Sequence, residues 1–459
     1  MKENYLEALK WYGKAADMGN AEAKYKLGKI LFEEAKRYLQ ESWEQGNIDA
    51  IEYIKEKQID ISYRDCIVFM SPKSFSISAK KTWDGIIEYS LDKMNWFKWD
   101  GSGIESNIIY MRGYGNTVIT GQHDTEGRWG FETKDKLICR GNIETLLDYK
   151  ICSRGEHPPM QEYCYALMFK GCTSLKEAPA LPAKELAGCC YWRMFEGCTS
   201  LIEAPVLPAT ELANSCYASM FEDCTSLKEV PALPATELAD GCYYEMFRGC
   251  TSLSEAPALP ATKLVRVCYM SMFRGCISLE EAPTLPAMEL AERCYDSMFK
   301  GCTSLKEAPS LSVMELADCC YASMFEGCTS LKEAPALPAR ELAYSCYWSM
   351  FEGCTSLKEA PALPATKLAN WCYKLMFDGC TSLSEAPALP AMELADGCYA
   401  SMFAGCTSLS EAPALPATKL AKYCYFSMLN GCTSLKEAPA LPATKLAERC
   451  YDSMFSGCT

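Results

Sequence analysis

The side chains best suited to chemistry in this chain are its cysteines, 29 in 459 residues, of which 24 recur at two fixed positions. One series runs from Cys164 to Cys450 and the other from Cys172 to Cys458, each with a period of 26 residues. Three chemistries compete here. Buried thiols pack as small apolar groups, disulfides between units need an oxidising compartment, and zinc is typically held by Cys-x-x-Cys pairs. Because seven residues separate the two cysteines of a unit, we favour buried thiols and keep the other two as alternatives.

A column of glutamates is the second candidate, with one carboxylate at position 14 of each complete unit, counted from the opening cysteine. Stacked units would align these like charges along one face, where directly opposed like charges destabilise a sheet. The column has two interpretations, a stripe that binds cations or a basic partner, and a solvated charge row that prevents sheet aggregation, which we favour. Its members are Glu177, Glu203, Glu229, Glu255, Glu281, Glu307, Glu333, Glu359, Glu385, Glu411 and Glu437.

Position 3 of the unit is the third candidate, because it varies while its neighbours stay constant. It holds Trp192, Tyr244, Trp348 and Phe426 in four units and Ala, Asp, Met or Lys in others. Exposed aromatic side chains are what protein-binding surfaces use as anchors. We therefore expect these four residues to contact a protein partner.

Catalysis, metals and cofactors have no candidate residues outside the repeat. The two histidines, His123 and His157, belong to no metal-binding or triad pattern. No nucleophile elbow, phosphate loop or acid pair stands apart from the repeated unit. We expect a non-enzymatic protein without a metal site or a cofactor.

The elements that position these residues follow from twelve restarts of one unit, without insertion or loss. A strict period of 20 to 50 residues indicates stacked units of a solenoid. In the first unit, Cys164, Met168 and Cys172 are four residues apart, which predicts two turns of helix with both cysteines on the buried side. Leu175 to Leu181 reads as a short extended segment. The expected fold is an α/β repeat, a leucine-rich-repeat-type solenoid preceded by a small all-β unit and a short helical-hairpin region.

Prolines restrict the sheet of such a solenoid. All eleven complete units have Pro at the position of Pro179, and ten have a second at that of Pro182, with Ser312 as the exception. Because proline has no N–H for a sheet ladder, the shared sheet must be two or three residues wide, and side-chain stacking must do much of the holding. At about 4.8 Å for each unit, the array would be roughly 50 to 55 Å long.

The unit resembles the BspA-type leucine-rich repeat, through Met-Phe-x-Gly-Cys-Thr-Ser-Leu-x-x-Ala-Pro over residues 164–459. That resemblance implies a bacterial cell-surface or secreted protein that adheres to host matrix or other cells. Two features depart from it, the prolines within the strand and a charged amphipathic start at residues 1–20 in place of a signal peptide. The alternative is an intracellular scaffold, so the localisation stays open between cell surface or secreted and cytoplasmic.

Three regions are expected, residues 1–60, 61–150 and 151–459. The first resembles the Sel-one-like helical repeat, a relative of the tetratricopeptide repeat, through residues 8–12, 14–16 and 19–28. That resemblance implies protein binding. The second contains five to seven short strands, a short helix at 143–149, and four tryptophans at positions 83, 96, 99 and 129. They are interpreted as core residues, with a carbohydrate-stacking platform as the alternative.

Charge narrows the class of partner. The formal net charge is −14, and residues 164–459 contribute 22 − 33 = −11. Because phosphate binding needs a basic stripe, the acidic array argues against nucleic acid, and no apolar run approaches the length of a membrane span.

The last unit breaks off ten residues after it begins at Cys450. We interpret the chain as the middle of a longer protein.

Overall fold

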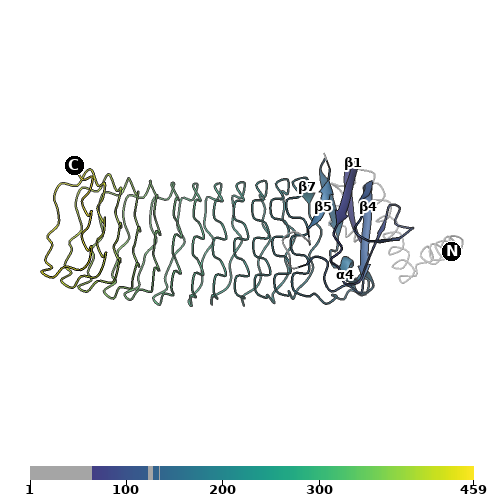
Figure 1. Ribbon diagram of the computed structural model, residues 1–459, viewed down its shortest axis with the longest axis horizontal. Helices are drawn as coiled ribbons and strands as arrows, with labels where there is room; N and C mark the ends of the chain where they lie inside the picture. Colours follow the sequence, from purple (N-terminus) through teal and green to yellow (C-terminus); the bar gives the residue numbers. More distant parts are fainter. Residues whose placement is uncertain (1–64, 122–127, 134) are drawn as a thin grey trace, which may run out of the picture. The chain divides into compact units, whose positions relative to one another are not determined.

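The computed structural model describes residues 65–121, 128–133 and 135–459. The Sel-one-like region expected at residues 1–60 therefore lies outside the described residues, as does His123. The described part begins with a strand-rich leader and continues as a stack of coils (Figure 1). All of it belongs to one compact unit.

The leader is a mostly antiparallel sheet, with the strand order β3-β2-β4-β1-β6-β7 and β5 paired to β1. A register shift between Met70 and Phe75 interrupts the β1–β4 pair. β6 and β7 pair in parallel, and this pair joins the leader sheet to the first repeat unit. The strands are β1 (Ile67–Ala79), β2 (Ile86–Ser90), β3 (Phe97–Trp99), β4 (Ile104–Tyr114), β5 (Trp129–Glu132), β6 (Leu137–Gly141) and β7 (Leu175–Glu177).

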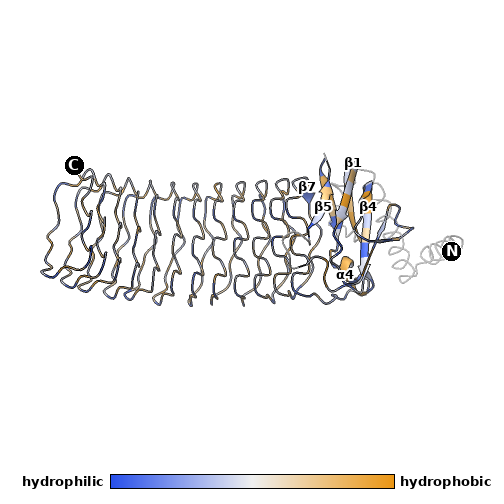
Figure 2. Cartoon of the chain, in the orientation of Figure 1, coloured by the Kyte–Doolittle hydropathy of each residue, from blue (hydrophilic) through white to orange (hydrophobic). Residues whose placement is uncertain are grey.

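One short helix, α4 (Thr145–Cys152), follows β6. Its buried residues Thr145, Leu146 and Leu147 pack in the core, and Figure 2 colours the helix as hydrophobic. The backbone is not helical at Asp148, whose carboxylate accepts the N–H groups of Lys150 and Ile151 at 3.0 and 3.2 Å. The strands and the short helix predicted for the leader are confirmed, but β1 and β4, with 13 and 11 residues, are longer than the short strands expected.

The helix predicted in each repeat unit is wrong: no α-helix is present between residues 153 and 459. The backbone instead has a positive φ at every fourth residue, as at Arg293 (54°), Ser297 (57°) and Gly301 (75°). A left-handed residue at this spacing breaks the continuous right-handed path that an α-helix needs. The segment from position 26 to position 9 is therefore a series of turns, which we call the turn ladder.

The turn ladder holds neighbouring units together with backbone hydrogen bonds. In one unit, the N–H groups of Tyr295, Ser297 and Phe299 donate to carbonyls of the next unit at 3.1, 2.8 and 2.9 Å. The residues between them donate within the unit, three residues back, as Met298 does to the Tyr295 carbonyl at 3.2 Å. Five such bonds between units, from residues 293, 295, 297, 299 and 301, cross this interface. Side-chain stacking therefore does not act alone.

The extended segment forms the narrow sheet that the prolines require. In the first unit β7 ends at Glu177, two residues before Pro179. In later units the segment is reduced to isolated parallel bridges, such as Glu203 with Glu229 and Glu281 with Glu307. Most backbone hydrogen bonds between units therefore come from the turn ladder, and only a few come from the extended segment.

The interior of the array consists of aligned columns of identical side chains. Consecutive tyrosine rings from Tyr165 to Tyr451 are stacked with centroids 5.6–6.0 Å apart. Consecutive phenylalanine rings from Phe169 to Phe403 are 5.3–5.8 Å apart. These columns advance further for each unit than the spacing of about 4.8 Å in a sheet, so the expected length of 50 to 55 Å is too short along this side.

The leader packs directly on the first unit and covers its interior. Phe131 of β5 stacks on Phe169 with centroids 5.3 Å apart and so begins the phenylalanine column. The N–H of Ile119 donates to the Cys164 carbonyl at 3.0 Å, and that of Trp129 to the Met168 carbonyl at 3.3 Å. The leader therefore closes the end of the stack and satisfies carbonyls of the first turn ladder.

Candidate partner-binding surface

The turn ladder displays a face on which side chains vary from unit to unit. Its columns are positions 26, 3 and 7, and we call them the variable face. Contacts between columns place them side by side: Tyr163 at position 26 packs edge-on against Trp192 at position 3, with ring centroids 6.2 Å apart. Arg293 at position 26 lies 3.9 Å from the Asp296 carboxylate at position 3. The backbone bonds beneath are formed whatever side chains these positions carry.

The four aromatic residues predicted at position 3 lie on the variable face, in separate units. Trp348 is 40% exposed, and Trp192, Tyr244 and Phe426 are half-buried. Three of them lie beneath a cation of this chain, and the Lys374 ammonium is 5.7 Å from the Trp348 ring centroid. The Arg193 guanidinium is 5.2 Å from the Trp192 ring centroid, and that of Arg449 is 5.4 Å from the Phe426 ring centroid.

Position 7 of the variable face carries charges that pair between units. Lys300 Nζ lies 2.6 Å from Glu326 of the following unit, and Arg248 bonds to Glu222 of the preceding unit. Asp378 has no such cation. Burial and the nearby Glu352 raise the pKa of its carboxyl to about 6.

The predicted glutamate column forms, in the extended segment rather than on the variable face. Glu333, Glu359 and Glu385 stack through successive parallel bridges and are exposed. Glu177 differs, because it is half-buried and both of its oxygens accept hydrogen bonds from Arg140 of β6. No other member of the column, all of which lie in described residues, has an ion pair.

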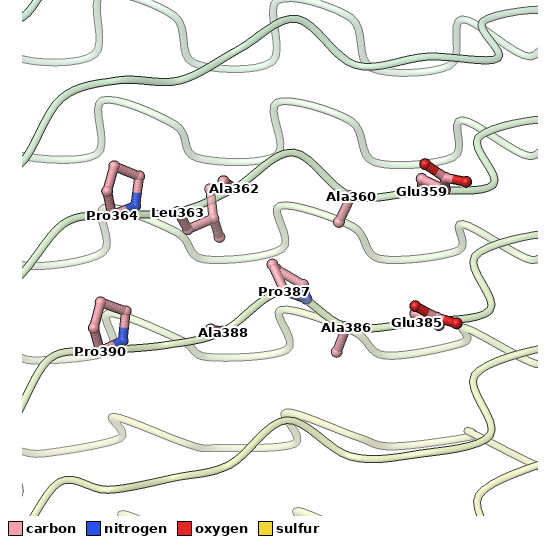
Figure 3. A pocket seen from close by; sticks show the side chains of 10 residues that line it. All are labelled: Glu359, Ala360, Ala362, Leu363, Pro364, Glu385, Ala386, Pro387, Ala388 and Pro390. Carbon is pink, nitrogen blue, oxygen red and sulfur yellow. The ribbon is translucent and has the colours of Figure 1, made fainter.

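Shallow hollows lie beside this column, where the prolines keep neighbouring segments from pairing. One of about 470 Å³ is lined by residues 359–364 of one unit and 385–390 of the next. In Figure 3 the two glutamates lie at one end, Pro364 and Pro390 at the other, and Pro387 between them. A smaller hollow of about 220 Å³ occupies the same place between residues 282–286 and 309–312. Neither contains a cluster of polar groups that would fix a ligand.

A second charged column, at position 22 of the unit, was not predicted from the sequence. Lys263 Nζ lies 2.8 Å from Glu289, and Lys367 pairs with Glu341 in the same way. These side chains are about two-thirds exposed, so each pair contributes little to stability. The alternation of Glu and Lys at a fixed position of the repeat was the signal that would have revealed them.

The cysteine columns are free thiols, all buried except the half-buried Cys458, which is the alternative that the sequence favoured. From Cys198 to Cys458, each thiol at position 9 donates a hydrogen bond to a carbonyl at position 6 of the preceding unit, as from Cys328 Sγ to the Phe299 carbonyl at 3.1 Å. That carbonyl also accepts the N–H of Cys302. Burial raises the pKa of the Cys276 thiol to about 12. These thiols act as interior packing groups that also satisfy backbone carbonyls.

The tryptophans of the leader do not make an exposed platform. Trp83, Trp99 and Trp129 are 1–3% exposed, and the Trp83 and Trp99 rings stack with centroids 5.0 Å apart. Trp96 alone is accessible, and the Arg112 guanidinium covers its ring at 3.9 Å. The carbohydrate-stacking alternative is therefore wrong for three of the four, and the interpretation as core residues holds for them.

His157 lies beside Glu144, with Nδ1 2.8 Å from Oε2 of that buried carboxylate. Burial raises the pKa of Glu144.

Elsewhere in the described chain, no three or more His, Cys, Asp or Glu side chains are grouped to hold a metal ion. No helix within residues 65–121, 128–133 and 135–459 is long and apolar enough to cross a bilayer.

Comparison with known families identifies the repeat. The family model described as the BspA type leucine rich repeat region (6 copies) matches two overlapping stretches, residues 161–279 and 242–358. No curated protein and no solved structure matches the chain. Residues 161–358 are thus similar to BspA-type leucine-rich repeats, which suggest protein partners and are typically non-enzymatic.

Proposed function

We propose that the BspA-type repeats of this protein bind a protein partner through the variable face. The observation that carries the proposal is the contrast between a constant interior and changing positions 26, 3 and 7 on one hydrogen-bonded backbone. Aromatic residues anchor many protein interfaces, and here Trp192, Tyr244, Trp348 and Phe426 occupy the changing positions. The glutamate column is the second candidate surface, since its carboxylates are exposed and unpaired beyond Glu177.

For the localisation and role of the protein, we propose a bacterial surface or secreted protein that acts like an adhesin. The match to BspA-type repeats supports it. The alternative is an intracellular scaffold that binds proteins through both the helical repeats expected at residues 1–60 and the solenoid. One observation favours the alternative: eleven thiols from Cys198 to Cys458 donate hydrogen bonds and must stay reduced to do so. Disulfides persist mainly in oxidising compartments.

The binding proposal is tested with immobilised extracellular matrix and with whole host cells. Purified protein is compared with an aromatic variant (Trp192→Ala, Trp348→Ala, Phe426→Ala) and a glutamate variant (Glu255→Gln, Glu281→Gln, Glu307→Gln). We expect the aromatic variant to lose binding and the glutamate variant to retain it. Retention by the first and loss by the second would move the surface to the glutamate column.

The localisation is tested by counting thiols in protein purified from its native host. Mass spectrometry after alkylation under denaturing conditions counts each free cysteine. Disulfide-linked columns would eliminate the intracellular scaffold, and a full set of free thiols would contradict a long-lived extracellular protein.

A further inference from the structure

One part of the variable face combines two indoles with a cation of this chain. Trp348 is at position 3 of one unit, and Lys374 is at position 3 of the next unit. Trp371 is at position 26, three residues before Lys374. The ammonium of Lys374 is 5.7 Å from the Trp348 ring centroid and 5.0 Å from that of Trp371. Both distances lie within the range of a cation–π contact. Tyr344, four residues before Trp348, is 48% exposed.

A glycine of the next unit makes room for the Trp371 ring. Gly397 has φ +58°, and a Cβ added there would lie 2.0 Å from Cζ3 of Trp371. The indole of Trp371 therefore lies directly against the Gly397 backbone, which any other residue would push away. The Gly397 backbone thus fixes the position of the Trp371 ring. We call Trp348, Trp371 and Lys374 the indole–lysine site.

Two other aromatic positions of the variable face show what this site lacks. Beside Trp192, the Arg193 guanidinium is 3.5 Å from the Glu196 carboxylate. Beside Phe426, the Arg449 guanidinium is 2.6 Å from Asp452. Lys374 has aromatic contacts of the same kind, but among the described residues it forms no ion pair. A carboxylate supplied by this chain completes the first two sites, and none completes the third.

We propose that the protein partner supplies this missing carboxylate. An Asp or Glu side chain of the partner would pair with Lys374, and an adjacent aromatic or prolyl group would lie on the exposed Trp348 ring. The pairing favours one carboxylate within an apolar segment, because a run of acidic residues would be repelled by an array whose net charge is 22 − 33 = −11. A basic segment fits less well, since its cation would have to displace Lys374 from between the rings. This inference rests on the proposed function of the variable face.

The test is selection from a phage-displayed library of random heptapeptides on the immobilised full chain. We expect enriched peptides with a single Asp or Glu next to Phe, Tyr, Trp or Pro. The tightest peptide is then synthesised, and its affinity is measured by the quenching of tryptophan fluorescence. Lys374→Ala and Trp348→Ala should each weaken binding at least tenfold, and so should the peptide with Asn or Gln in place of its acid.

A charge reversal makes the test specific. Lys374→Glu should abolish binding of the acidic peptide and bind its Lys-substituted counterpart instead. Lys332→Glu, which makes the same change of charge at an exposed residue of the extended segment, should leave the affinity unchanged. Hydrogen exchange of the neighbouring turn ladder shows whether each variant is folded.

Other outcomes overturn the inference. Enrichment of basic or phosphate-like sequences, no enrichment at all, or equal binding by Lys374→Glu would exclude the indole–lysine site as a carboxylate receptor. Peptides whose binding depends on Trp192 but not on Trp348 would overturn this inference and leave the proposed function intact. Matrix and cell binding that the aromatic variant retains would overturn the proposed function itself, independently of the peptides.

Discussion

Replacing Phe299 with alanine should divide the array into two parts that unfold separately. Phe299 is fully buried in the phenylalanine column, with Phe273 and Phe325 stacked on its two sides at 5.7 and 5.8 Å. Along the column, each ring stacks on the rings of the adjacent units. The stability of such an array is approximately a sum of unit terms and interface terms, so damage at Phe299 concentrates at two interfaces.

The magnitude follows from burial and stacking. Truncation of a fully buried phenylalanine to alanine typically costs about 3 to 5 kcal/mol. Each of the two stacked pairs accounts for about 0.5 to 1.5 kcal/mol beyond burial, so we expect a loss in the upper half of that range, about 4 to 5 kcal/mol. The backbone bonds across the damaged interface remain, since alanine keeps its N–H.

Hydrogen exchange followed by mass spectrometry measures the effect unit by unit. The N–H groups of Ser297 and Gly301, which donate to the next unit at 2.8 and 2.7 Å, should exchange on the order of a thousandfold faster in the variant. Units close to the leader should keep their protection, because the leader covers that end of the stack. Urea unfolding should change from one transition to two.

The matched control is Phe455→Ala in the last unit. Phe455 is half-buried, and the column neighbour at its position in the preceding unit is Leu429 rather than a phenylalanine. Its truncation should cost less than half as much and leave the middle units protected. Uniform loss of protection along the whole array after Phe299→Ala would refute the nearest-neighbour reasoning, and unchanged protection would show that the column does not hold the units together.

Three further predictions concern the thiols and the ion pairs. Because burial raises the pKa of Cys276 from 9.0 to about 12, the stability that its protonated thiol contributes is complete below about pH 9 and is lost as pH rises toward 12; urea midpoints should fall steeply above pH 9. Lys367→Glu breaks the exposed pair with Glu341 and should lower the free energy of unfolding by less than about 1 kcal/mol, an effect that 1 M salt removes. Arg140→Ala removes the two bonds to Glu177 and should cost about 1 to 2 kcal/mol by urea unfolding, with exchange rising first where β6 meets β7.

Sequence reasoning predicted the stack, its period and the residues of its interior. Those features depend on which side chains are apolar, and Cys294, Tyr295, Met298 and Phe299 are all buried as expected. The narrow sheet also followed from the prolines, because a missing N–H is a property of the residue itself. In both cases the composition alone carries the physical cause.

The helix was wrong because two structures share nearly the same period. Pairs of inward residues return every four residues in the turn ladder, close to the 3.6 residues of an α-helix turn. What distinguishes them is the left-handed backbone at Ser297, Ser323 and their equivalents. A serine in the sequence does not predict a positive φ as a glycine does. Bonds to a unit 25 residues away also leave no local signal.

The candidate site was predicted only in part. Trp348 stood out as an aromatic residue at a changing position, but Trp371 lies one residue before an opening cysteine and Lys374 lies in the next unit. Their meeting depends on the rise between units and on the space left by Gly397. The sequence pattern contains the residue types, and only the stacked backbone brings them together.

The turn ladder also bears on how such a protein can change over generations. Its bonds join backbone groups at a fixed step, so a unit gained or lost by unequal recombination leaves the remaining interfaces unaltered. Each added copy lengthens the tyrosine column by 5.6–6.0 Å and supplies three new outward positions that mutation can fill. Near-identical copies then provide raw material for new specificities, while the reach of the molecule is set by the number of copies.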